Sequence, residues 1–275
     1  MTARTATVGD NCLDRYLEPP GHELTGGNAL NVAVGLCRAG HEAAYLGAVG
    51  DDPEGRVVLH ALQAVGVDAR GVDVRHGSTG VTTVRLDRVG ERTFVDERYG
   101  VAAEYRLTPA AVDGLHDCRW VHGAHQAGFE ALAALRPGGT RLSYDFGDDL
   151  GGPDAGFVSE LDVAFCAAPG GDPSAGEALA AGLRRRGAAI AVVTLGEAGS
   201  LASADSTTFR QAAVPVDVVD TLGAGDAFIA GFISALLAGG SLPDALERGA
   251  ADAAETCRIV GAWPQPDRLT EEARS

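Results

Sequence analysis

The chain has 275 residues, of which 45% are hydrophobic and 22% charged, and its formal net charge at pH 7 is -16. This length and composition are those of a folded chain with one large domain, and they exclude a disordered one. The negative charge argues against nucleic acid or an anionic membrane as the main partner. Five scattered cysteines without metal-type spacing, no N-terminal signal segment and no membrane-spanning apolar run predict a cytoplasmic protein.

Short apolar runs alternate with helical patterns along most of the chain. The predicted strands are 6–9, 43–49, 120–123, 141–146, 163–167, 190–195 and 213–219. The predicted helices are 29–38, 54–65, 129–135, 175–186, 224–238 and 243–260. This alternation predicts an α/β fold in which a mostly parallel sheet is covered by helices on both faces. Ligands of such sheets bind beyond the carboxyl ends of the strands.

The segment 80–99 departs from this alternation. Residues 81–87 and 92–96 resemble two strands joined by a short turn, and their polar and β-branched side chains suit a hairpin outside the main core. The early segment 13–18 would add an edge strand to it. We interpret 13–18 and 80–99 as a small β lid within a single domain spanning 1–275, with an ordinary peripheral hairpin as the alternative. Edge strands of such lids can pair between subunits, so a homodimer through the lid is one arrangement open to the chain.

The stretch from Asp220 to Asp226 has the sequence Asp-Thr-Leu-Gly-Ala-Gly-Asp and precedes an apolar helical pattern. Gly225 and Asp226 therefore belong to the first turn of a helix, where free backbone N–H groups and the helix dipole attract anions such as phosphate. A carboxylate at this place can accept a proton beside the anion, a combination that indicates phosphoryl transfer to a hydroxyl. Asp and Gly also begin helices without any chemistry, which is the alternative interpretation.

Four stretches in the expected order resemble the ribokinase-like (PfkB) sugar kinases. They are 26–31, 49–55, 193–200 and 219–226. The resemblance covers nearly the whole chain and implies a Rossmann-like three-layer sandwich with a β lid, ATP as the phosphoryl donor, Mg²⁺, and phosphorylation of a primary hydroxyl. Details in 9–14, 144–148 and 261–263 are most similar to members that act on the 6-hydroxyl of fructoselysine and related fructosamines. A fructokinase, ribokinase or nucleoside kinase of the same family, or a catalytically weak sugar- or nucleotide-binding protein, are the alternatives.

The same resemblance implies roles for individual residues. Asp226 matches the catalytic base, and Gly223, Ala224 and Gly225 match the anion hole for the transferring phosphoryl group. The matched sugar-contacting positions are Asp14, Gly26, Gly27, Asn28 and Asn31. The matched nucleotide-contacting positions are Thr194, Gly196 and Gly199. Asp220 and Thr221, with Gly261 nearby, lie where family members often bind a monovalent cation such as K⁺, and we count Thr221 and Gly261 among the cofactor-binding residues.

Three further residues are predicted from their place in the chain. His122 forms His-x-x-His with His125 after a strand; a zinc pair there lacks a third ligand, so we assign His122 to the substrate pocket. Asp145 ends the next strand, where it can reach the acceptor or the water shell of Mg²⁺. Arg92, in the hairpin, can meet the amino-acid part of a fructosamine. Each has a structural alternative, namely a core histidine, a loop-capping acid and a solvated surface charge.

The chain also departs from the family pattern. Many members carry an Asn-x-x-Glu motif at the position of 167–172, where this chain has Ala-Ala-Pro-Gly-Gly-Asp. This departure leaves the arrangement of Mg²⁺ open, with Asp172 as a substitute candidate.

Overall fold

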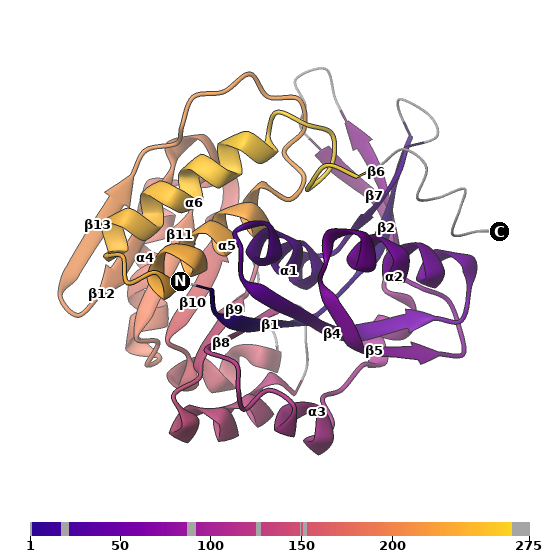
Figure 1. Ribbon diagram of the computed structural model, residues 1–275. Helices are drawn as coiled ribbons and strands as arrows, with labels where there is room; N and C mark the ends of the chain where they lie inside the picture. The colour runs from indigo at the N-terminus through magenta and orange to yellow at the C-terminus, as the bar shows by residue number, and fades with distance from the viewer. Residues whose placement is uncertain are drawn as a thin grey trace.

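The computed structural model describes residues 2–17, 22–86, 92–124, 128–148, 150 and 153–265. A nine-stranded sheet forms its centre (Figure 1), in the order β13-β12-β11-β10-β9-β8-β1-β4-β5. In chain order these strands are β1 (Arg4–Gly9), β4 (Glu42–Gly50), β5 (Asp68–Arg75), β8 (Trp120–Ala124), β9 (Arg141–Asp145), β10 (Val163–Ala167), β11 (Ile190–Thr194), β12 (Ser200–Ala204) and β13 (Thr207–Gln211). Only the β11–β12 and β12–β13 pairs of this sheet are antiparallel, which confirms the predicted mostly parallel sheet.

Helices cover both faces of this sheet. On one face lie α1 (Asn28–Arg38), α2 (Pro53–Val65), α5 (Ala224–Leu237) and α6 (Leu242–Thr256), and they share two apolar clusters with the strands. The cluster on the other face takes residues from α3 (Pro109–Asp113), α4 (Pro173–Arg185) and the 3₁₀ helices η2 (Phe129–Gly138) and η3 (Pro153–Glu160). Shorter 3₁₀ turns are η1 (Gly100–Glu104), η4 (Pro169–Gly171) and η5 (Gly196–Ala198). The predicted three-layer, Rossmann-like sandwich is therefore confirmed.

A second, four-stranded sheet stands beside the sandwich, at the upper right of Figure 1. Its order is β3 (Glu23–Gly26), β2 (Cys12–Tyr16), β6 (Val81–Leu86) and β7 (Arg92–Arg98). The predicted hairpin is present as β6 and β7. The early segment is not an edge strand as predicted, because β2 pairs with β6 on one side and with β3 on the other.

Several local predictions were wrong. Residues 213–219 form an extended loop and not a strand, with Val214, Val218 and Val219 each more than 40% exposed. Pro215 within it has no N–H to donate to a sheet. The helix expected over 129–135 is the 3₁₀ helix η2, which contains Pro137.

The sequence also led to expectations about the cysteines and about membrane-spanning helices. The five cysteines, all of which lie among the described residues, are free thiols. Among the helices that the structure describes, none has the length and apolar character needed to cross a membrane.

Candidate active site

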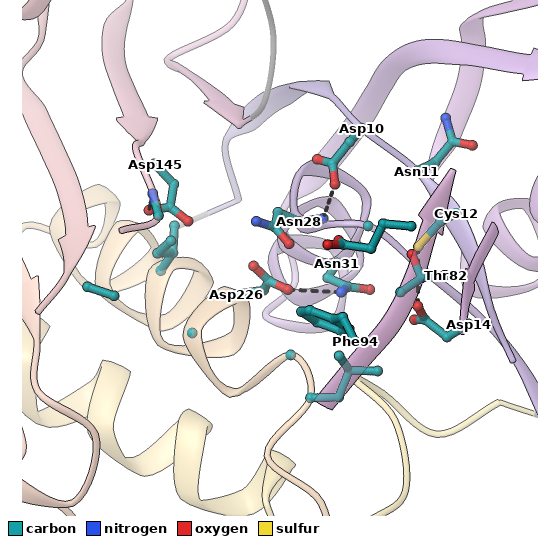
Figure 2. A pocket seen from close by; sticks show the side chains of 18 of the residues that line it. Asp10, Asn11, Cys12, Asp14, Asn28, Asn31, Thr82, Phe94, Asp145 and Asp226 are labelled. Carbon is teal, nitrogen blue, oxygen red and sulfur yellow. Dashed lines mark hydrogen bonds between the residues drawn. The ribbon is translucent and has the colours of Figure 1, made fainter. Parts of the chain in front are cut away.

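A cavity of about 550 Å³ opens between the carboxyl ends of the main-sheet strands and the small sheet. Asp10 follows β1 and Asp145 ends β9, while Asp14 and Phe94 come from the small sheet, and all four line the cavity. Figure 2 shows Asp145 on one side and Asp14 on the other, with Asp226 between them. The cavity therefore lies where parallel sheets bind their ligands.

Asp226 lies in the first turn of α5 and is 7% exposed. The Asn31 amide Nδ2 donates a hydrogen bond of 2.9 Å to its Oδ2 atom, drawn as a dashed line in Figure 2. Asn31 lies one turn into α1, so this bond joins the starts of two helices that are far apart in the sequence. The carboxylate is thus buried, oriented by a donor and open to the cavity that it lines.

The glycines before Asp226 fit a site for an anion. Gly223 is the N-cap of α5 with φ of 76°, and a Cβ there would come within 2.2 Å of the Ala262 Cβ. Gly225 lines the cavity, and a Cβ built on it would meet no heavy atom within 4 Å. A side chain at Gly225 would therefore fill space that a ligand can use, next to the amides of a helix N-terminus.

The second helix that begins at the cavity, α1, differs from α5 in this respect. The two Asp10 carboxylate oxygens accept hydrogen bonds from the backbone N–H groups of Asn28, at 2.9 Å, and Ala29, at 3.1 Å. A carboxylate from the end of β1 therefore neutralises the N-terminus of α1. No side-chain cap is found at the start of α5 in the described part of the chain. Of the two helix N-termini, α5 is the one suited to a phosphate.

On the side of the small sheet, Asp14 is 4% exposed and lines the cavity. Its Oδ2 atom would lie 2.0 Å from a Cβ on Gly26, so the predicted glycine at this position makes room for the carboxylate. The Cys12 thiol donates to Asp14 Oδ1 at 3.3 Å. Burial and the nearby Asp14 raise the pKa of Cys12 well above its usual range, so this cavity-lining thiol stays protonated.

Gly27, Asn28 and Asn31, predicted from the same resemblance, also line the cavity. Gly27 has φ of 109° as the N-cap of α1, and a Cβ there would lie 2.4 Å from the Asn11 Cα. Among the predicted nucleotide positions, Thr194 lines the cavity. Gly196 and Gly199 form the turn between β11 and β12 beyond it.

Asp220, which the resemblance links to a monovalent cation, lies at the start of the loop that leads to Asp226. It is completely buried, and its two oxygens accept hydrogen bonds from the Tyr16 hydroxyl (2.6 Å) and from the backbone N–H groups of Leu222 (2.9 Å) and Gly261 (2.8 Å). These three hydrogen bonds connect the loop to β2 and to residue 261, and a role of Asp220 in binding K⁺ stays a prediction. Thr221 is half-buried in the same loop.

His122 is not part of the cavity wall. It is completely buried in β8, its Nδ1 atom lies 2.9 Å from Ser143 Oγ, and its ring packs edge-on against Phe165 at 5.9 Å. Burial lowers its pKa to about 3, so the ring is neutral. The prediction of a substrate contact is wrong because strand alternation points His122 into the core, on the same face as Trp120.

The remaining predicted residues are placed as follows. Ala224 begins α5, and Gly261 follows α6 with φ of 78°. Arg92 begins β7, but its side chain lies outside the described residues, as does all of His125. Asp172 caps α4 by accepting from the Ser174 N–H, and it is exposed rather than part of the cavity.

Sequence reasoning missed several residues of the cavity wall. Asp10, Cys12, Thr82, Phe94 and Cys166 were given no role, although all line it. For Asp10 a signal was available, because a helix that begins with Gly-Gly-Asn has no side chain of its own at the N-cap and needs an acceptor from elsewhere. The other four come from strands that local pattern does not bring together.

Comparison of the sequence with known proteins identifies a family. Residues 18–118 and 149–267 match the model of the pfkB family of carbohydrate kinases. The chain belongs to this family. Fructoselysine 6-kinase of Escherichia coli (strain K12) is 39% identical over 265 residues, covering 94% of this chain and 98% of that protein. The fructosamine kinase FrlD of Bacillus subtilis (strain 168) is 34% identical, covering 98% and 96%.

A solved structure supports the same conclusion on the fold. Arabidopsis thaliana ribokinase, complexed with ribose and ATP, superposes with a TM-score of 0.82 at 22% identity, over 100% of this chain and 99% of that one. The chain is therefore an ATP-dependent sugar kinase of the pfkB family, with a ribokinase-like fold.

Proposed function

We propose that this kinase phosphorylates the 6-hydroxyl of a fructosamine such as fructoselysine, with Asp226 as the general base. The observation that carries the catalytic part is the buried Asp226 carboxylate, held by Asn31 at the open N-terminus of α5. The similarity to fructoselysine 6-kinase and to a fructosamine kinase supports the choice of substrate.

In the proposed reaction, the sugar hydroxyl attacks the γ-phosphorus of ATP. As the new oxygen–phosphorus bond forms, the bond from that phosphorus to the bridging oxygen breaks and ADP leaves, while the hydroxyl proton passes to Asp226. Phosphoryl transfer depends mainly on positioning and charge stabilisation, and the amides beside Gly223 and Gly225 supply both for the transferring group. Asp14, Asn28 and Asn31 would hold the sugar, since polyols need several directional donors and acceptors.

Mg²⁺ would reach this site together with ATP. In the part of the chain that the structure describes, no three His, Cys, Asp or Glu side chains gather as a metal site. Mg²⁺ usually keeps several waters and takes one or two carboxylates together with substrate phosphates. Asp145 at the end of β9 is the cavity carboxylate that we assign to its water shell. When bound, the ion would neutralise charge on the transferring phosphoryl group.

The charge of the cavity supports an aminated sugar over a neutral one. Among the residues that the structure describes, six acidic residues and one basic residue, Arg98, line it. The acids are Asp10, Asp14, Glu97, Asp145, Asp148 and Asp226. Arg98 is already paired with Asp96, at 3.1 Å. Such a surface raises the local concentration of cations, and a fructosamine carries an ammonium group next to its sugar.

Three further expectations belong to the same proposal. We assign 13–18 and 80–99 to a lid of one domain spanning 1–275, and a second copy would pair with the edge of β7, where residues 93–98 are exposed.

The free thiols support a reducing cytoplasm. K⁺ stays a prediction from the resemblance alone, tested by replacing it with Na⁺ in the assay below, while sedimentation at several concentrations tests the dimer.

The experiment is a measurement of ADP release with Mg²⁺ and K⁺ for fructoselysine, other fructosamines, fructose, ribose and adenosine at equal concentration. We expect the highest kcat/KM for a fructosamine. A preference for fructose, ribose or adenosine would keep the family and overturn the substrate. No turnover of any of them by folded protein would favour the alternative of a weakly catalytic binding protein.

A further inference from the structure

A chain of two hydrogen bonds runs from the C-terminal part of the protein to Asp226. The Trp263 indole Nε1 donates to Asn31 Oδ1 at 3.2 Å, and Asn31 Nδ2 donates to Asp226 Oδ2 at 2.9 Å. All three side chains are buried, with 4%, 7% and 7% of their surface exposed. They come from the turn after α6, from α1 and from α5, so only the folded protein brings them together.

The chemistry of the three groups gives this chain a direction. An indole N–H donates and cannot accept, and an ionised carboxylate accepts and cannot donate. The Asn31 amide between them has one end of each kind. With Trp263 bound to the oxygen, the amide nitrogen faces Asp226; the flipped amide would place its oxygen against the carboxylate and its NH₂ group against the indole N–H. Both contacts would then be repulsive, so the indole fixes which end of Asn31 meets Asp226.

The neighbours of Trp263 contact the same loop. The Gly261 N–H donates to Asp220 Oδ2 at 2.8 Å, at the start of the loop that ends in Asp226. Ala262 lies against Gly223, so closely that a Cβ on that glycine would overlap it. Three consecutive residues, 261–263, therefore contact the beginning, the middle and, through Asn31, the end of this loop.

We propose that Trp263 is a positioning residue: its indole N–H holds the Asn31 amide in the orientation that donates to Asp226, which keeps that carboxylate ionised and aimed at the acceptor hydroxyl. This inference rests on the proposed role of Asp226 as the base. Trp263 itself does not line the cavity among the residues described, so it acts through Asn31.

The test compares the only two tryptophans of the chain. Trp263→Phe removes the N–H that reaches Asn31. Trp120→Phe removes another buried indole N–H, which donates to Ser143 Oγ at 2.7 Å and not to Asn31. The readouts are kcat, the KM values for ATP and sugar, and the pH at which kcat falls to half on its acid side.

For Trp263→Phe we expect kcat to fall about tenfold, with a small change in KM for ATP. The pH at which kcat falls to half on the acid side, called here the acid half-point, should move up by about 0.5–1 pH unit. The reason is that a carboxylate that loses a donor is more easily protonated. Trp120→Phe should leave the half-point in place. The other titratable groups that line the cavity are the same in both variants, so they cancel in the comparison. Among the described residues they are Asp10, Cys12, Asp14, Glu97, Arg98, Tyr99, Asp145, Asp148 and Cys166.

Two additions keep the test decisive. In an Asn31→Ala background, Trp263→Phe should cause no further shift, because the link to Asp226 is already absent. If Trp263→Phe folds poorly, residue 263 can be replaced in the Trp120→Phe background by β-(3-benzothienyl)alanine, which keeps the ring shape and lacks the N–H. An unchanged half-point in either form, or a full shift in the Asn31→Ala background, would overturn the inference. Normal kcat in Asp226→Asn would overturn the proposed base as well, so the two failures are distinguishable.

Discussion

The loop that ends in Asp226 and the edge strand β7 both line the cavity, and they differ in what holds them. Asp220, at the start of the loop, is completely buried and accepts three hydrogen bonds, while Asp226 at its end is held by Asn31. In β7 the side chains of residues 93–98 are all exposed, and β6 is its only strand partner in the small sheet.

This difference separates groups that need exact placement from groups that do not. Groups that act on the transferring phosphoryl must be placed within a fraction of an ångström, and they lie where packing and hydrogen bonds leave little freedom. Glu97 and Arg98 also line the cavity, but they lie on an exposed strand where substitutions cost little stability. The comparison predicts large effects in the loop and small, substrate-dependent effects in β7.

The largest effect is expected for Asp226→Asn. The amide cannot accept the hydroxyl proton, so kcat should fall by about 10²–10⁴-fold, with little change in sugar affinity. Steady-state ADP release and sugar binding by calorimetry measure the two quantities. Asp217→Asn, which changes an exposed acid that is not among the residues lining the cavity, is the control and should stay near the parent. Near-normal kcat in a folded Asp226→Asn protein would falsify the assignment.

The second effect concerns the stability of the loop. Asp220→Asn places an NH₂ group among three donors, so the free energy of unfolding should fall by about 2–4 kcal/mol. Tyr16→Phe is the milder control, with a loss of about 1–2 kcal/mol, because the carboxylate keeps the two backbone donors. Urea unfolding followed by circular dichroism measures both. An Asp220→Asn protein as stable as the parent would show that the loop is not held as described.

The third effect is a pH dependence of the protein's stability, caused by His122 in the main sheet. Burial lowers the pKa of His122 to about 3, so the unfolded chain binds a proton more readily than the folded one between about pH 6.5 and 3, and stability is lost as the pH falls through that window. From pH 7 to 5 this contribution is about 2 kcal/mol. His122→Phe should remove it from the measured slope, whereas His116→Gln, an exposed histidine, should not. Equal slopes in all three proteins would contradict the assignment.

The smallest effect is expected in β7. Glu97→Gln should raise KM for a fructosamine about twofold to fivefold, because an exposed ion pair contributes about 0.2–1 kcal/mol. KM for fructose, which has no positive charge, should not change, and this substrate serves as the control. An equal rise for both sugars would mean that Glu97 does not contact the ammonium group.

Sequence alone predicted the parts of the fold whose cause is local. Apolar runs at strand and helix spacing predicted the central strands, and the pattern after Gly223 predicted the start of α5 at Ala224, where the structure has it. The strand β5, with the sequence Asp-Ala-Arg-Gly-Val-Asp-Val-Arg, was missed because an edge strand need not be apolar. The error at 213–219 is the opposite one: its residues are apolar, but no strand that the structure describes pairs with them.

The site followed the same rule. Gly225, Asp226 and Asn31 lie in short motifs that the sequence shows, and all three line the cavity. His122 was misplaced because it was taken to follow a strand, whereas it lies inside β8 and alternation turns its side chain into the core beside Phe165. The bond from Trp263 to Asn31 joins residues 232 positions apart, and no local pattern contains it.

That bond also makes the protein its own optical probe. In Trp120→Phe, all tryptophan fluorescence comes from residue 263, whose excited state is sensitive to the partner of its N–H. A sugar that rearranges Asn31 on binding should therefore change the emission directly. Dissociation constants then become measurable at equilibrium, even in an Asp226→Asn protein that turns nothing over, because the fluorophore lies two hydrogen bonds from the carboxylate position.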